Sequence, residues 1–448
     1  MAGRRIGLGI AAAAALALAA PASAAPVVRS YEAGPFDLSN YKVALSITGL
    51  VPKPDVDGFI TKMKTDVVDA ATHKLVPIQR VMLHHIVFAN LFALGEGKAP
   101  QPFYGDGEER AKMELPPGYG YPTRAADRWA IVWMLMNHRN RGDRVMIRYT
   151  VTIDTNPRLK PVVPVVLDAS HGRQGLVYDV AGGGRPGSLD VRTARTLAPA
   201  TGRLVAGLGH VHGGAKDLVV TQPTCGNRVI YRSRPTWGLA SHPFYHVRPV
   251  LHEPGPIDMS RFASRQGIPV TAGQPLQLSS RYDTTRPHTR VMGLLLMYLA
   301  PDPAVTDGCG PLPRDVRTLR TSTPGRSAAP RVTIPLTGFG PGGLGITVPG
   351  PPGATVRTNG DADVSVGSNF FAAGNLSVPA GATVTWRFGD SVLHNVTLAS
   401  GPRGFSSDRL KDGGTYSQRL TVPGTYRFFC ELHPVGMVQR IVVRPPGA

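Results

Sequence analysis

The sequence predicts a mainly β protein of three domains that ends in a small Greek-key sandwich. Gly and Pro are abundant, with 52 and 42 residues, and separate valine-rich and threonine-rich runs, a pattern typical of short strands and turns. A chain of 448 residues exceeds one compact core, and ordinary domain sizes predict three. From about Asp361, short alternating runs separated by turn residues indicate the terminal sandwich.

The first 24 residues predict a cleaved secretion signal. Arg4 and Arg5 precede an alanine-rich apolar run, and Ala22-Ser23-Ala24 has the small residues that suit a signal peptidase. The run is shorter than the roughly 20 residues of a membrane span, which disfavours an anchor. We therefore expect a secreted, extracytoplasmic protein of the cell envelope, and both Sec and twin-arginine export stay open.

The formal charge of +19 limits the expected partners. A basic surface favours association with the anionic cell wall. Nucleic acid is not expected, because an exported protein rarely meets it and the chain lacks the aromatic and basic interleaving of single-strand binders. A cell-wall adhesion module is supported only by this charge and the many strands.

Three cysteines in an oxidising compartment allow one disulfide and leave one cysteine over. The surroundings of Cys430 assign it to a metal, as described below. Cys225 and Cys309 are then expected to form a disulfide, and two buried free thiols are the alternative.

The last long loop carries ligands of a type 1 copper site. It reads Cys430-Glu-Leu-His433-Pro-Val-Gly-Met437, and His394 stands earlier in the same domain. Copper that cycles between two oxidation states with little rearrangement suits one thiolate, two imidazoles and a weak axial thioether. A short loop delivers three of these ligands, and a neighbouring strand delivers the other histidine.

Residues 361–448 resemble the plastocyanin and azurin-like cupredoxins, and the resemblance implies an electron-transfer copper. Trp386, Phe428 and Phe429 are candidates for the apolar shell that sets the potential. Multicopper oxidases and copper nitrite reductases place a histidine beside the copper cysteine, whereas Glu431 stands here. The chain is therefore expected to be neither a laccase nor a nitrite reductase of the usual pattern.

Further histidines form groups upstream of a Pro/Gly-rich linker. On a strand, His210-x-His212 points both rings to one face, and Met292 could supply a soft third ligand for copper. The adjacent His84 and His85 would face opposite sides of a regular strand, so joint ligation needs a twist or a bulge. Taken alone, either pair is compatible with a structural role.

The order of these groups, with His138 between them, resembles the copper monooxygenases typified by peptidylglycine α-hydroxylating monooxygenase and dopamine β-monooxygenase, and also the Nod19-like proteins. The resemblance covers about residues 30 to 310 and implies two tandem jelly-roll-like β-sandwich domains with one copper each. It assigns an electron-storing copper to His84, His85 and His138. It assigns the copper that activates dioxygen to the candidate catalytic residues His210, His212 and Met292.

The sequence also departs from the peptide hydroxylase. Leu208, Leu294 and Leu296 occupy the places that grip a peptide carboxylate, so a glycine-extended peptide is not expected. The three leucines predict a hydrophobic substrate pocket or core packing, and packing is favoured. His288, four residues before Met292, could orient the metal ligands, or it could compete with Met292 as a ligand. Five histidines without metal-like spacing are expected to be ordinary: His73, His171, His242, His246 and His252.

The leading hypothesis is a secreted copper-dependent oxidoreductase, an O2-using monooxygenase with a fused type 1 copper domain. An external electron donor would reduce that domain, which would pass electrons to two further coppers, and the substrate would be a small or apolar molecule. The alternative is a non-catalytic copper-binding electron carrier or copper store with a degenerate scaffold. The predicted layout is a signal at 1–24, monooxygenase-like domains at 25–165 and 166–313, a linker at 314–360 that allows transient docking, and a cupredoxin at 361–448.

Overall fold

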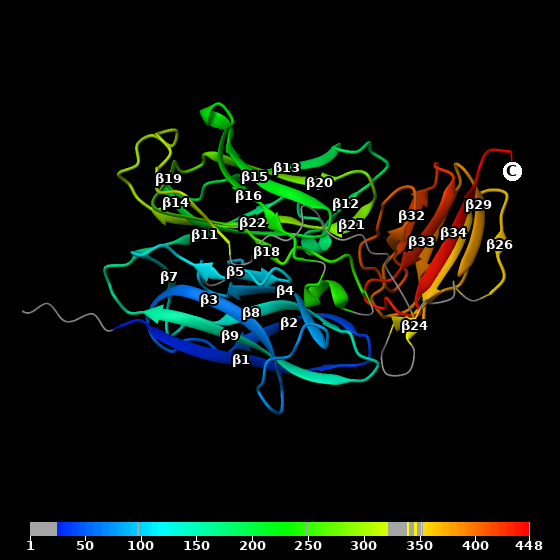
Figure 1. Ribbon diagram of the computed structural model, residues 1–448, viewed down its shortest axis with the longest axis horizontal. Coiled ribbons are helices and arrows are strands. Elements are labelled where there is room, and N and C mark those ends of the chain that lie inside the picture. Colours follow the sequence, from blue (N-terminus) through cyan, green and yellow to red (C-terminus); the bar gives the residue numbers. More distant parts are fainter. Residues whose placement is uncertain are drawn as a thin grey trace, which may run out of the picture.

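The computed structural model describes residues 25–95, 98–239, 241–247, 250–320, 338–339, 345–346, 351 and 353–447. Over these residues the chain is mainly β, as predicted, and folds into three sandwiches (Figure 1). Its described helices are three short 3-10 turns, η1 (Gln174–Leu176), η2 (Pro223–Cys225) and η3 (Pro243–His246). No helix in the described ranges is long and apolar enough to cross a membrane. The predicted signal lies outside them.

Two sheets form the N-terminal sandwich. The first has the order β1-β9-β3-β7-β10, with β6 paired to β3, and the second has the order β2-β8-β4-β5. The first contains β1 (Val27–Leu38), β3 (Gly58–Asp69), β6 (Met113–Glu114), β7 (Tyr119–Thr123), β9 (Asp143–Asp154) and β10 (Lys160–Pro161). The second contains β2 (Val43–Val51), β4 (Val81–Asn90), β5 (Gln101–Gly107) and β8 (Trp129–Asn137).

The middle sandwich has a five-stranded and a four-stranded sheet, with the orders β11-β22-β14-β19-β23 and β13-β20-β15-β16. The five strands are β11 (Val163–Asp168), β14 (Gly202–Val211), β19 (Arg261–Val270), β22 (Gly293–Pro301) and β23 (Arg317–Leu319). The four are β13 (Leu189–Leu197), β15 (Ala215–Gln222), β16 (Arg228–Ser233) and β20 (Pro275–Asp283). Two small pairs join β12 (Tyr178–Val180) to β21 (His288–Val291), and β17 (Pro235–Thr236) to β18 (Asp258–Met259).

These two sandwiches pack against each other through one continuous core. Val205 and Leu208 of β14 belong to the same buried cluster as Phe88 of β4. The Tyr298 hydroxyl donates a hydrogen bond to the carbonyl oxygen of Phe103 across the interface at 2.8 Å. Since β4 carries the His-His pair and β14 carries the His-x-His pair, this packing brings the two pairs toward each other.

The C-terminal sandwich consists of sheets with the orders β26-β29-β34-β33-β31 and β28-β27-β30-β32. The first contains β26 (Val356–Arg357), β29 (Asn375–Pro379), β31 (Thr397–Ser400), β33 (Gly424–Phe429) and β34 (Val438–Arg444). The second contains β27 (Ala362–Gly367), β28 (Phe370–Phe371), β30 (Thr383–Phe388) and β32 (Thr415–Arg419). Strands β23 and β26, at the two ends of the predicted linker, pair with neighbouring sandwiches. Of the residues between them, β24 (Gly338–Phe339) and β25 (Gly345–Ile346) form a small pair, and much of the rest lies outside the described residues.

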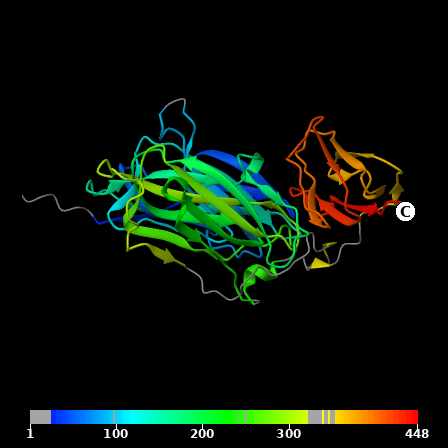
Figure 2. The same cartoon turned by 90° about the horizontal axis from the view of Figure 1, so that it is seen from above.

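The C-terminal sandwich sits against one end of the other two (Figures 1 and 2). The Thr289 hydroxyl of β21 donates to the Leu398 carbonyl oxygen of β31 at 2.8 Å, and the Gly404 amide donates to the Ala181 carbonyl oxygen at 2.8 Å. The side chain of Leu432, which follows Cys430 in the ligand loop, packs with a second buried cluster of the N-terminal and middle domains. The domain is therefore docked through direct contacts, a firmer arrangement than the transient docking that the linker suggested.

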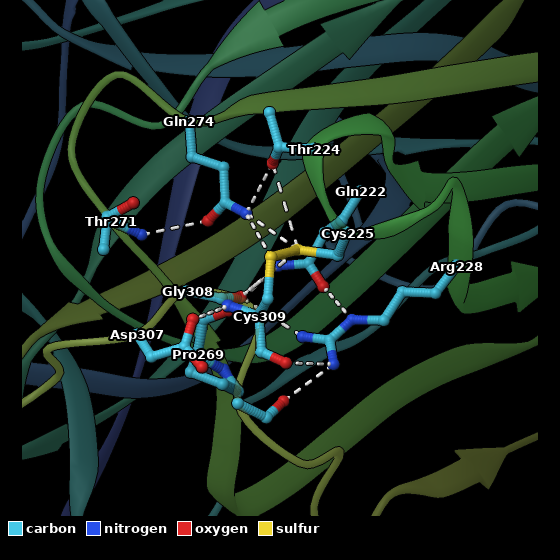
Figure 3. The surroundings of a disulfide bond; sticks show 11 residues. Gln222, Thr224, Cys225, Arg228, Pro269, Thr271, Gln274, Asp307, Gly308 and Cys309 are labelled. Atoms are coloured by element: carbon cyan, nitrogen blue, oxygen red, sulfur yellow. Dashed lines mark hydrogen bonds between the residues drawn. A yellow bond between two sulfur atoms is a disulfide. The ribbon is translucent and has the colours of Figure 1, made fainter.

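The structure confirms the expected disulfide between Cys225 and Cys309, which are 84 positions apart in the sequence. It fastens η2 to the segment after β22, where the Arg228 guanidinium donates to the Cys309 carbonyl oxygen at 2.8 Å (Figure 3). Cys430 is the free cysteine of the described residues, and it is buried.

Candidate metal sites

The C-terminal site is assembled where β31, β33 and β34 meet. Ligand atoms of His394, Cys430 and His433 lie within 4.8 Å of one another, and Cys430 Sγ is 3.5 Å from His433 Nδ1. Met437 is fully buried immediately before β34, and its carbonyl oxygen accepts a hydrogen bond from the Cys430 amide at 3.1 Å. This bond closes the loop, so the residues predicted as ligands from opposite ends of it are brought together.

The donor set fits a soft transition metal. His394 Nδ1 is buried without a hydrogen-bond partner, whereas its Nε2 faces the Asp390 carboxylate at 3.2 Å. A carboxylate on one ring nitrogen orients the other nitrogen toward a metal. Burial raises the pKa of the Cys430 thiol to about 11, so the thiolate form requires a cation beside it.

Two of the three residues of the predicted aromatic shell share a core with Cys430 and Met437. Trp386 and Phe428 are buried and pack edge to face, and the Trp386 indole N–H donates to Gln439 Oε1 at 2.8 Å. Phe429 is also buried, but it faces the N-terminal and middle domains and packs with Val250. Two of the three aromatic residues therefore line the interior of the sandwich, and the third belongs to the interface.

A β-bulge in β4 places both histidines of the first pair on one side. Leu83 pairs with Leu135, but His85 pairs with Met134, so His84 is an extra residue in the ladder. The bulge is the irregularity that joint ligation required, because adjacent side chains of a regular strand point apart. The ring centroids of His84 and His85 are 3.8 Å apart.

His210 and His212 lie at the end of β14, with ring centroids 5.3 Å apart. Tyr282 of β20 links this pair to Met292. Its hydroxyl accepts a hydrogen bond from the His212 amide at 2.8 Å and donates one to the Met292 carbonyl oxygen at 2.7 Å. Met292 lines the same cavity as both histidines.

The two histidine pairs form a single cluster, which differs from the two separate sets expected from the sequence. His85 Nε2 is 2.9 Å from His212 Nε2, and these two with His84 form one group of converging ligand atoms. The close packing of β4 on β14 explains the convergence. His138 is not in any such group of the described residues; it is buried after β8 and lines a small hollow with Met82 and His252.

Two glutamates and one further histidine complete the cluster. The Glu108 carboxylate contacts His84 Nδ1 and His252 Nε2, and Glu109 Oε1 is 2.9 Å from His210 Nδ1. His252 was expected to be an ordinary histidine, because its position in the sequence shows no ligand spacing. His288 instead faces Glu253, with Nδ1 2.8 Å from Oε2.

Burial keeps three histidines of the cluster uncharged. Burial, and then the neighbouring His252, lower the pKa of His84 to about 4. Burial also lowers the pKa of His85 and His212 well below the ordinary value. For His210 burial acts the same way, but the Glu109 carboxylate outweighs it and the pKa is raised. His210 Nε2 is buried without a hydrogen-bond partner. Neutral imidazoles with free lone pairs are the form that binds metals.

Two cavities meet at the cluster. A small one of about 70 Å³ is lined by His84, His212 and His252 on one side and by Phe429 and Glu431, which flank Cys430, on the other. A larger cavity of about 610 Å³ is lined by His85, His210, His212 and Met292 and by many apolar residues. The apolar residues include Leu45, Ile47, Val132, Trp133, Leu176, Leu208, Leu294 and Leu296.

Leu208, Leu294 and Leu296 therefore lie on the wall of a cavity. The sequence favoured core packing for these three residues, and the structure favours the pocket. Leu294 and Leu296 remain partly exposed, while Leu208 is buried.

Two protein families match parts of the chain. The plastocyanin/azurin family of copper binding proteins matches residues 359–444, and the family described as Stress up-regulated Nod 19 matches residues 136–302. The second match includes His138, His210, His212 and Met292, whereas His84 and His85 precede it.

Characterised relatives match the C-terminal region. Amicyanin-alpha of Methylorubrum extorquens is 32% identical over 87 residues, which span 19% of this chain and 72% of that protein. The plastocyanin of Sambucus nigra is 35% identical over 89 residues, spanning 17% and 90%. A purple cupredoxin from Nitrosopumilus maritimus, a solved structure, has 30% identity and a TM-score of 0.17, with 19% of this chain and 100% of that chain covered. A reduced amicyanin variant has 30% identity and a TM-score of 0.18, with 19% and 83% covered.

Proposed function

Because the chain belongs, through residues 359–444, to the plastocyanin/azurin family of copper-binding proteins, we propose that it is a secreted copper monooxygenase with a built-in electron donor. The C-terminal domain is a copper-binding cupredoxin for electron transfer, with His394, Cys430 and His433 as its candidate site. The proposal adds Met437 as the axial ligand, copper in the histidine cluster and a substrate in the apolar cavity.

The shared small cavity carries this proposal. Phe429 and Glu431, on either side of Cys430, line the same space of about 70 Å³ as His84, His212 and His252. A cupredoxin that exchanged electrons only with other proteins would not need to bury the face beside Cys430 against the histidine cluster of the other two domains. The docked geometry instead supports electron transfer from Cys430 toward that cluster.

The large cavity supports the choice of substrate. Its wall is mainly aliphatic and aromatic, and the histidines and Met292 lie together along it. A pocket of this size and character suits a small apolar molecule, oriented by few polar groups. Three neutral imidazoles and a thioether form a donor set that suits copper in its reduced state.

The proposed reaction inserts one oxygen atom of O2 into a C–H bond of the substrate and releases the other as water. Two protons and two electrons are consumed, and an external donor supplies the electrons one at a time through the cupredoxin. Bound copper would supply electron transfer in the cupredoxin and dioxygen reduction at the cluster. The chain holds the ligands, keeps the imidazoles of His84, His85 and His212 neutral, and lines the pocket with apolar side chains.

Dioxygen uptake by the copper-loaded protein tests the proposal. With ascorbate as donor, we expect uptake that Met292→Ala abolishes while the intense blue absorption of the cupredoxin copper remains. Cys430→Ser should remove the blue absorption and lower uptake at least about tenfold, since one-electron relay through this copper is then lost. A blue protein with one copper per chain and no uptake would instead establish the alternative, an electron carrier.

A further inference from the structure

A second convergence of ligand atoms lies beside the histidines that line the apolar cavity. His84, Glu108 and His252 each bring a ligand atom within 4.8 Å of the other two. We propose that they form a separate site for a divalent ion of the zinc or copper class, joined to the cavity-facing site through the His84 ring. Two imidazoles and a carboxylate are a donor set that such ions accept.

His252 and His84 converge on one carboxylate oxygen of Glu108. His252 Nε2 contacts Glu108 Oε1, and Nδ1 of the same ring is buried without a hydrogen-bond partner. The other oxygen, Oε2, accepts the Gly255 amide at 2.8 Å. Oε1 is thereby directed at the two imidazoles, and a shared cation explains why all three groups converge.

The His84 ring is placed to connect two ions. Its Nδ1 contacts Glu108, so Nε2 is the atom left for the group with His85 and His212. An imidazole that binds metals through both nitrogens has released its N–H proton to solvent. Its two ions are then held on opposite edges of one ring.

The two sites face different cavities. His252 lines the small cavity that Phe429 and Glu431 of the cupredoxin also line, whereas His85 lines the large apolar cavity. His84 lines both. If the proposed function holds, the new site adds a second ion beside the copper of the cavity-facing site, in a space that the cupredoxin also lines. The presence of the ion itself does not depend on that function.

Metal content of the full chain tests the site. The protein is stripped with a chelator, reloaded with Cu(II), desalted and analysed for copper per chain. We expect three coppers in the wild type and two in His252→Ala and in the isosteric Glu108→Gln. His242→Ala is the matched control, because His242, the residue before η3, lies outside the cluster, and this variant should keep three coppers. A wild type with fewer than three coppers, or variants that keep three, would overturn the site.

Electron paramagnetic resonance shows whether His252 binds a second copper ion or only stabilises the structure around the first. Two Cu(II) ions bridged by one imidazole couple, so the wild-type signal should integrate to the cupredoxin copper alone. His252→Ala should restore a second, uncoupled copper signal, with unchanged circular dichroism and blue absorption as the check on folding. An unchanged signal in that variant contradicts the bridge.

Three coppers without dioxygen uptake would overturn the proposed function only, and uptake with two coppers would overturn the new site only.

Discussion

Gly107, the last residue of β5, lies directly against the histidine cluster. A Cβ at this position would stand 2.9 Å from His210 Cε1, from Glu109 Oε2 and from the His84 carbonyl oxygen. All three neighbouring atoms belong to residues of the cluster. The backbone can approach so closely only because glycine carries no side chain.

We therefore expect Gly107→Ala to displace His210 and Glu109. Disturbing the groups that orient metal ligands typically lowers metal affinity about 10- to 100-fold, and overpacking costs about 1–3 kcal/mol of stability. Copper affinity is measured by competition with a chromogenic chelator. Gly105→Ala on the same strand is the control, since its Cβ would meet no atom closer than 3.5 Å. Equal affinities in the two variants would contradict this account.

At the residue level, the sequence predicted groups whose members are close along the chain. The loop from Cys430 to Met437 and the two histidine pairs could be identified because their spacing carries the geometry of ligation. Glu108, Glu109 and His252 could not, because they reach the cluster from a turn after β5 and a loop after η3, and tertiary packing alone brings them there. The same packing merged two expected sites into one cluster.

At the level of elements, strand alternation predicts which sheets face solvent. Strand β9 alternates between buried and partly exposed residues, as expected where one face is covered. Strands β4 and β8 are almost continuously buried, since their sheet lies between the other sheet of its sandwich and the middle domain. Sequence could identify these strands, but the continuous burial of β4 and β8 depends on a domain contact that no local pattern encodes.

The disulfide should stabilise the middle domain substantially. It closes a long loop, because Cys225 and Cys309 are 84 positions apart, and loop-closure entropy for such a length corresponds to about 4.5 kcal/mol. We expect the double variant Cys225→Ala/Cys309→Ala to lose stability of this order in thermal unfolding. A reductant should lower the melting temperature of the wild type and leave that of the variant unchanged. Equal melting temperatures without reductant would contradict the estimate.

Strand β21 fastens the cupredoxin through a buried ion pair. Arg290 Nε is 2.6 Å from Glu431 Oε2, and the two side chains are 5% and 14% exposed. Leaving a buried charge without a partner costs about 3–5 kcal/mol, and the loss of Arg290 should cost less, because Glu431 Oε1 keeps Arg409 Nε at 2.6 Å. We expect Arg290→Gln to weaken docking, seen as faster hydrogen exchange at the interface amides around Leu398 and Gly404.

Arg387→Gln provides the control for that variant. Arg387 and Asp363 of the same domain are 58% and 64% exposed, and exposed pairs contribute at most about 1 kcal/mol. Exchange at the interface should stay at the wild-type rate. If Arg290→Gln behaves like this control, the ion pair does not hold the domains together.

At the scale of the whole molecule, the direct contacts of the docked domain predict that electron transfer is insensitive to linker length. Doubling a flexible connection changes its closure free energy by only about 0.6 kcal/mol, or about threefold in a rate limited by encounter. Hydrogen bonds at Thr289 and Gly404 and the Arg290 ion pair already fix the docked position.

We expect an insertion of flexible residues between positions 320 and 338 to leave unchanged the first-order rate at which the reduced cupredoxin copper reoxidises. Arg290→Gln should slow it in rapid-mixing experiments with O2. A rate that falls about threefold when the insertion doubles the length of the connection would mean that the cupredoxin searches on a tether, as the sequence suggested.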